Sequence, residues 1–156
     1  MRQIRIPAAF VRGGTSNGLA FLRSNLPASK DDWKQIFLAA MGSPDPNSRQ
    51  LDGMGGGISS LSKILVVEKS HVTGVDIDYT FCQVSPRDSW VAYTNICGNM
   101  ASAAAPFAYD EGLLDKHNEE IAVRVRSTNT GVLFDSHFFI DNGKSAVDGS
   151  FELPGV

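Results

Sequence analysis

Short β-prone runs recur along the chain, and some of them alternate apolar and polar residues with the period of a β-strand. The alternation is clearest at 75–84, where the apolar positions Val75, Ile77, Tyr79 and Phe81 fall on one face. Further β-prone runs lie between glycine-rich or polar turn segments, at 3–11, 19–22, 63–68, 121–126 and 131–140. The pattern therefore predicts a protein in which strands outnumber helices.

Helical spacing is confined to two stretches. The first, 29–41, begins with Ser29 as a potential N-cap and is followed by Gly42, which favours a helix end. Its apolar stripe predicts a face packed on the core and consists of Trp33, Ile36, Phe37, Ala40 and Met41. The second is the alanine-rich run 101–105, after which Pro106 either breaks the helix or occupies the first turn of another. A helix so small and apolar suits the inside of a sheet, and the expected fold class is α+β.

The composition is that of one globular domain and argues against several kinds of partner. The 156 residues carry a net charge of −3, which gives no basic surface for nucleic acid. No apolar run is long enough to span a bilayer, and no signal peptide opens the chain, so we expect a cytoplasmic protein without a membrane partner. The two cysteines suit a reducing compartment, and the three histidines lack the spacing of metal ligands, so no metal site is expected. Cys82, on the polar register of the 75–84 strand, is expected to be inert.

A glycine-rich segment, 51–62, leads into the strand that begins at Lys63. Glycine lets a ligand approach main-chain N–H groups closely, and successive N–H groups form an anion-binding concavity. The segment therefore predicts a carboxylate cradle with Lys63 as an acid/base group at its rim. The candidate substrate contacts are Gly55, Gly56, Gly57, Ser59 and Ser60. The alternative is a flexible loop followed by a solvated lysine.

Named phosphate and nucleotide motifs do not explain this segment. A P-loop requires Gly-Lys, whereas Ser62 precedes Lys63, and the dinucleotide fingerprint requires a glycine where Ser60 stands. Ser60 and Lys63 do have the S-x-x-K spacing of serine–lysine hydrolases, but the companion S-D-N and K-T-G motifs are absent from the sequence. We therefore rank the hydrolase below the carboxylate cradle.

A second candidate loop is the segment 12–18. Its Gly-Gly and Asn-Gly pairs are hairpin signals and predict a turn between two strands. Arg12 offers a planar fork that matches a carboxylate, and the hydroxyls near it add short donors. The candidate contacts are Arg12, Gly13, Gly14, Thr15 and Ser16. An ordinary turn is the alternative.

The third candidate is the segment 95–100. Cys97 lies at or just before the N-terminus of the alanine-rich helix, where unpaired N–H groups and the helix dipole favour a thiolate. Gly98 and Asn99 follow it and complete the candidate site. The alternative is a buried structural cysteine.

These segments together resemble the PrpF family, whose members include 2-methylaconitate cis-trans isomerases, 4-oxalomesaconate tautomerases and methylitaconate isomerases. The motifs that carry the resemblance, in order, are Arg12-Gly13-Gly14-Thr15-Ser16, Asp52-Gly53-Met54-Gly55-Gly56, Ser62-Lys63 and Asn95-x-Cys97-Gly98-Asn99. The resemblance implies a diaminopimelate epimerase-like fold, in which two lobes, each a curled and mostly antiparallel sheet around a central helix, enclose the active site. Residues 1–156 are similar to the N-terminal lobe as a single domain, with the start of an interlobe linker at 144–156.

The resemblance also implies a reaction. It is that of a cofactor-independent isomerase, which shifts an allylic proton or isomerises cis to trans on an unsaturated di- or tricarboxylate such as an aconitate or itaconate derivative. Lys63 would act first as acid/base, and Cys97 would be the partner acid or a substrate contact. Asn17 stands where many members have a lysine, which leaves the substrate preference open. The alternative is a non-catalytic lobe that binds carboxylates or assembles with another chain, since a homodimer or a second lobe would cover its bare face.

Overall fold

The computed structural model describes residues 3–116 and 118–149. Its strands are β1 (Ala9–Gly13), β2 (Ser16–Leu22), β3 (Lys63–Lys69), β4 (Ile77–Val84), β5 (Val91–Ala92), β6 (Glu120–Ser127), β7 (Leu133–Asp141) and β8 (Lys144–Ser145). Its α-helices are α1 (Trp33–Met41), α2 (Gly98–Ala101) and α3 (Ala104–Asp110), and short 3-10 turns occupy Arg23–Asn25, Lys30–Asp32 and Ser59–Leu61. The excess of strands over helices confirms the α+β prediction.

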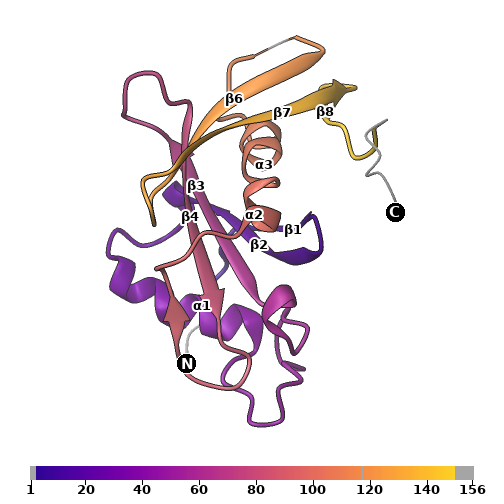
Figure 1. The fold of residues 1–156 in the computed structure, drawn as a ribbon. Helices are drawn as coiled ribbons and strands as arrows, with labels where there is room; N and C mark the ends of the chain where they lie inside the picture. The colour runs from indigo at the N-terminus through magenta and orange to yellow at the C-terminus, as the bar shows by residue number, and fades with distance from the viewer. Residues whose placement is uncertain (1–2, 117, 150–156) are drawn as a thin grey trace.

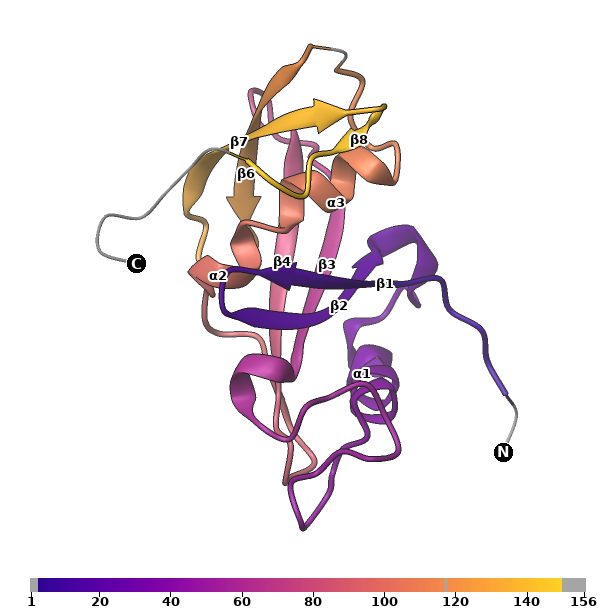
Figure 2. The ribbon, with the colours of Figure 1, turned by 90° about the vertical axis from the view of Figure 1, so that its right-hand side faces the viewer.

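The strands form one strongly curled sheet in the order β1-β2-β3-β4-β6-β7-β8, with β5 paired to β4. Among the described strands, β2–β3 and β4–β6 are parallel, and the other five pairings are antiparallel. Figure 2 shows the β1–β2 hairpin crossing β3 and β4 at a steep angle. The strands β6 and β7 lie at the end of β4 that is farther from α1 (Figure 2). A curled, mostly antiparallel sheet is the predicted architecture.

The α2–α3 segment lies on the inner face of this sheet, as Figure 1 shows. Its small side chains allow the helices to approach the strands closely, and they share a core with Leu65, Tyr79 and Val123. Pro106 is the third residue of α3, so its missing N–H falls in the first turn, where no intrahelical partner is required. Of the two predicted placements, a helix break or the first turn of another helix, Pro106 therefore takes the second.

Helix α1 covers the outer face and builds a second core with β2, β3 and β4. Ser29 caps as predicted, because its hydroxyl accepts the N–H of Asp31, but the first turn is 3-10 and the α-helix starts at Trp33. Gly42 ends the helix in the left-handed region, at φ 74°. Cys82 belongs to this outer core and is fully buried, and burial raises the pKa of its thiol, which agrees with an inert residue.

The predicted bounds of the first hairpin were wrong. The first strand runs from Ala9 to Gly13 instead of over 3–11, and the second starts at Ser16 instead of residue 19, so Gly14 and Thr15 alone make the turn. Lys144 and Ser145, at the start of the predicted linker, pair with β7 as β8, and the linker itself stays a prediction. The rest of the proposed linker from residue 150 onward lies outside the described residues, as does His117. In the described part of the chain, no helix has the length and apolar character needed to cross a bilayer.

Candidate functional site

Lys63 is the first residue of β3, and the alternation of the strand places it on the inner face with Leu65 and Val67. Its Nζ lies 2.9 Å from Ser16 Oγ and 3.1 Å from Cys97 Sγ. The ammonium also stands 5.8 Å from the centre of the Phe81 ring, within cation–π range. Three segments far apart in the sequence therefore meet at one lysine.

Close approach of β2 makes this meeting possible. Gly18 pairs with Lys63 in the parallel register, and a Cβ at Gly18 would lie 1.9 Å from the Lys63 carbonyl oxygen. Ser16, two residues earlier on the same face, is almost fully buried and directs its hydroxyl at the amine. Glycine at position 18 is thus a packing requirement that brings a buried hydroxyl to the lysine.

Cys97 is the N-cap residue of α2 and is half-buried. Burial raises the pKa of its thiol, but the backbone N–H of Met100, the ammonium of Lys63 and the backbone N–H of Asn99 lower it more, so that the net pKa is below the ordinary value. The predicted stabilisation of a thiolate at this position is therefore present. The other cysteine, Cys82, is fully buried, and burial outweighs the charge of Lys30, so the pKa of its thiol is raised.

The β1–β2 turn packs directly onto the first turn of α2. Asn99 Nδ2 donates to Thr15 Oγ1 at 2.9 Å. A Cβ at Gly13 would lie 2.0 Å from the Asn99 carbonyl oxygen, and Gly14 has φ +52° with its Cβ position 2.4 Å from Asn99 Oδ1. Both glycines are needed for the contact between the β1–β2 turn and α2. At Gly98, in contrast, an added Cβ would meet no atom within 4 Å.

Arg12 is not brought to this cluster. It lies inside β1 and pairs with Asn17, and both alternate with residues that face the inner side, so Arg12 lies on the outer face of the sheet. Its side chain is exposed and forms no hydrogen bond or ion pair with any described residue. The sequence placed Arg12 beside the hydroxyls because the turn was taken to begin there. The strand continues two residues further, to Gly13, so Arg12 follows the alternation of the strand and faces the outer side.

The glycines of the glycine-rich segment do not form the predicted N–H cradle in this conformation, because their own N–H groups are used inside the protein. Gly55 donates to the Met41 carbonyl at 3.2 Å, Gly56 to the Leu61 carbonyl at 3.1 Å and Gly57 to Gln50 Oε1 at 2.8 Å. These glycines are required by packing and, at Gly57, by φ +79°. They support the segment that leads to Lys63, and they offer no anion site of their own here.

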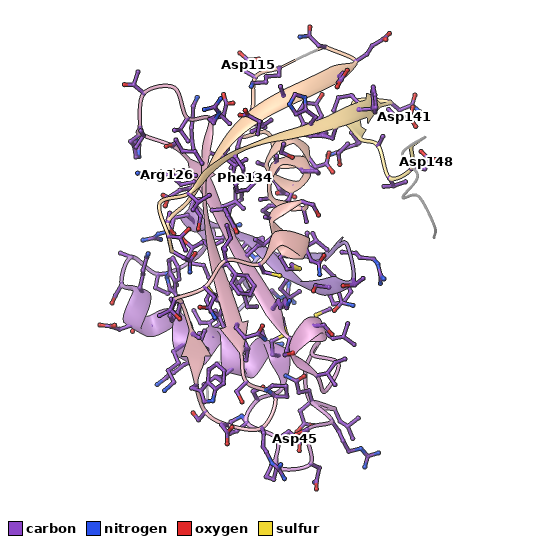
Figure 3. All side chains as sticks on the ribbon, in the orientation of Figure 1. Asp45, Asp115, Arg126, Phe134, Asp141 and Asp148 are labelled. Carbon is purple, nitrogen blue, oxygen red and sulfur yellow. The ribbon has the colours of Figure 1, made fainter. Side chains whose placement is uncertain are left out.

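The organising residue of this segment is Gln50, which the sequence did not single out. Its side chain is almost fully buried; Nε2 donates to Ser43 Oγ, and Oε1 accepts from Gly57 N–H and from Ser62 Oγ at 2.7 Å. Asp45, labelled at the lower end of Figure 3, accepts the Gln50 backbone N–H at 2.7 Å and fixes the turn before it. A glutamine ahead of a glycine run carries no sequence signal for such a role.

Ser59 and Ser60 lie in the 3-10 turn before β3, and no hydrogen bond joins either side chain to Lys63. The hydroxyl that contacts the lysine is that of Ser16, so the S-x-x-K hydrolase arrangement of Ser60 is not formed. Ser62, next to Lys63, is buried and bonded to Gln50. Among the residues that the structure describes, no three His, Cys, Asp or Glu side chains gather as metal ligands.

Tyr79 is another residue that the sequence did not connect with the site. It is fully buried behind Cys97, and no described residue lies within hydrogen-bond geometry of its hydroxyl. Burial, together with the charge of Cys97, raises the pKa of Tyr79 to about 12. Tyr79 therefore stays protonated under the site and contributes no titratable group near neutral pH.

Comparison with known proteins assigns the chain to a family. The PrpF protein family model matches residues 3–156. The chain belongs to the PrpF family. It is 39% identical over 162 aligned residues to the 2-methyl-aconitate isomerase of Cupriavidus necator, a match that covers 99% of this chain and 41% of that relative.

Solved structures agree with the family assignment. The crystal structure of a methylitaconate-delta-isomerase superposes with a TM-score of 0.90 at 36% identity, covering 99% of this chain and 39% of the other. A hydroxyproline epimerase from Agrobacterium vitis, with bound trans-4-hydroxy-L-proline, gives a TM-score of 0.57 at 12% identity over 88% of this chain and 38% of its own, and shows the fold alone. These matches confirm the predicted diaminopimelate epimerase-like fold. The PrpF member spans about two-fifths of the length of the relatives it matches.

Proposed function

We propose that this PrpF member is the proton-transferring lobe of an isomerase for an unsaturated di- or tricarboxylate, such as an aconitate or itaconate derivative. The observation that carries the proposal is the 3.1 Å contact between Lys63 Nζ and Cys97 Sγ at the inner face of the sheet. One of these groups can accept a proton while the other donates one, which an allylic proton shift requires. The names of the matched relatives, a 2-methyl-aconitate isomerase and a methylitaconate-delta-isomerase, support the substrate class.

The lowered pKa of Cys97 suggests how the roles divide. A thiol whose pKa is lowered gives up its proton more readily, and the thiolate can then take a proton from a carbon next to a carboxylate, while Lys63 can return one to the other end of the allylic system. The ammonium also faces the negative charge that develops on the dienolate. Lys63 thus remains the first acid/base candidate, and the structure favours Cys97 as the base that works with it.

Substrate contacts are proposed from the same neighbourhood. Ser16 and Thr15 supply hydroxyls next to the pair, and Gly98 leaves open space above α2. Arg12 and the glycine-rich segment are less suitable contacts, because Arg12 faces the outer side and the glycine N–H groups are occupied. No cofactor is needed for the proposed step.

The remainder of the enclosing cleft is proposed to come from a second lobe or a second copy of the chain. The relatives are more than twice as long as this chain, and an isolated lobe would leave the reacting atoms open to water. Residue 150 onward, where the expected linker leaves the lobe, lies outside the described residues. A non-catalytic, carboxylate-binding lobe is the second candidate, because Ser16 and Thr15 supply hydroxyls that can bind a carboxylate without any proton transfer.

Deuterium incorporation distinguishes the two candidates. The chain is incubated in D₂O with cis-aconitate, itaconate and their methyl derivatives, and proton NMR follows deuterium entering the carbon skeleton. The isomerase proposal predicts incorporation into at least one acid, which Lys63→Ala and Cys97→Ala each abolish. Lys69→Ala, an exposed lysine at the other end of β3, is the matched control and should retain the rate. Absence of incorporation into every acid would contradict catalysis by this chain and favour the binding lobe.

A further inference from the structure

Lys63 and Cys97 form a pair that oxidation can join covalently. Nζ and Sγ are already in contact at 3.1 Å, and both side chains are half-buried, within reach of a small oxidant. Thiolate character and access are the two properties that make a cysteine sensitive to peroxide. The flexible four-carbon stem of lysine allows Nζ to close the remaining distance.

We propose that Cys97 reacts with hydrogen peroxide and that Lys63 captures the oxidised sulfur in a thiol-reversible sulfur–nitrogen bridge. The proposal rests on the contact between the two side chains and holds whether or not the lobe is an isomerase. The bridge would remove both groups of the pair at once, so it would be a reversible block of the site.

The chemistry balances with peroxide as the oxidant. In the first step the Cys97 thiolate attacks one peroxide oxygen, the O–O bond breaks, the sulfur is oxidised to a sulfenic acid, and the other oxygen leaves as hydroxide, which takes a proton from the Lys63 ammonium and becomes water. In the second step the deprotonated Lys63 nitrogen attacks the sulfur, the S–O bond breaks, and the hydroxyl leaves with a proton from nitrogen as water. The product chain is lighter than the starting chain by two hydrogen atoms.

The surroundings leave Lys63 as the nearest capturing group. The sequence has two cysteines, and Cys82 is fully buried in the core on the outer face of the sheet, so it cannot resolve the sulfenic acid as a disulfide. A backbone nitrogen is the other nucleophile that commonly captures a sulfenic acid. The adjacent one belongs to Gly98, and closure on it would give a product of the same mass.

Tryptic mapping separates these products. Trypsin cleaves after Lys63 only when its amine is free, and the two cysteines fall on different tryptic peptides, 70–87 for Cys82 and 88–116 for Cys97. The folded chain is treated with hydrogen peroxide with and without dimedone, which traps sulfenic acids, and is then digested and analysed by mass spectrometry. Lys63→Arg keeps the cation but removes the nucleophilic amine, and Cys97→Ser removes the sulfur.

The expected result is loss of cleavage after Lys63, with this residue joined to peptide 88–116, and restoration of cleavage by a thiol reductant. Lys63→Arg should instead accumulate the dimedone adduct on Cys97, Cys97→Ser should show neither product, and Cys82 should stay unmodified in all of them. Equal dimedone labelling of Cys97 in the wild type and in Lys63→Arg would overturn the proposal. Retained cleavage after Lys63 in a chain lighter by two hydrogens would also overturn it, since it would assign the bridge to the Gly98 backbone.

Discussion

The two glycine-rich segments, 12–18 and 51–62, look alike in the sequence and differ in what they do. In the first, glycines at 13, 14 and 18 let the hairpin touch α2 and β3, and the residue between them, Ser16, reaches Lys63. In the second, the glycines fold the segment onto Gln50 and the end of α1, and their N–H groups are consumed. The difference shows that a glycine run reports close packing, and that ligand chemistry must be sought in the side chains beside it.

The largest effect is expected where backbone touches backbone, at the hairpin. Gly13→Ala would place a Cβ 2.0 Å from the Asn99 carbonyl oxygen, and overpacking of this kind should lower the free energy of unfolding by about 3 kcal/mol. Gly98→Ala is the matched control, because its Cβ meets no atom within 4 Å and should change stability by no more than about 0.5 kcal/mol. Urea unfolding measures both. Equal destabilisation would contradict the interlocked hairpin.

A smaller effect is expected in the second segment. Gln50→Ala would leave the Gly57 N–H without its acceptor and remove the hydrogen bonds to Ser43 and Ser62, which should cost about 2 kcal/mol in the free energy of unfolding. Gln35→Ala, an exposed glutamine of α1, should stay within about 0.5 kcal/mol. If Gln50→Ala matched this control in urea unfolding, the segment would not be organised by Gln50.

The smallest effect concerns the hydrogen bond that joins the hairpin to α2. Thr15→Val keeps the shape of the side chain and removes the oxygen that accepts from Asn99 Nδ2, in an exposed position, so the expected loss is about 0.5–1 kcal/mol. Thr73→Val, in an exposed turn, is the control. Indistinguishable unfolding midpoints would mean that glycine packing alone holds the hairpin.

The sequence predicted those parts of the fold and site that depend on local patterns. The α1 stripe, the alternation of β4 and the placement of Cys97 before a small buried helix all appear as expected. The motifs also selected Lys63 and Cys97 as the candidate acid/base residues, and the structure brings their side chains into contact.

What the sequence could not supply depends on register and long-range pairing. Arg12 was misplaced because the strand extends two residues further than predicted, to Gly13, and its alternation directs the Arg12 side chain to the outer face. The contact between Ser16 and Lys63 follows from the parallel pairing of β2 with β3, 47 residues apart, for which no local pattern exists. The role of Gln50 depends on three partners that only the folded segment assembles.

The central claim, that Lys63 and Cys97 act as one coupled pair, is tested most directly by the pH dependence of Cys97 alkylation. Because the folded-state pKa of Cys97 lies below its ordinary value, its ionisation stabilises the fold above the unfolded-state pKa, and that stability is lost as pH falls through the folded-state pKa. Iodoacetamide reacts with the thiolate, so Cys97 of the folded chain should react at lower pH than an ordinary cysteine, while Cys82 stays protected.

Lys63→Met supplies the decisive comparison, because it removes the ammonium while burial remains. The account predicts that the midpoint of the alkylation profile of Cys97 moves to higher pH in this variant, and that Lys69→Met leaves it in place. An unchanged midpoint in Lys63→Met would show that the two side chains are neighbours without electrostatic coupling, and would contradict the account.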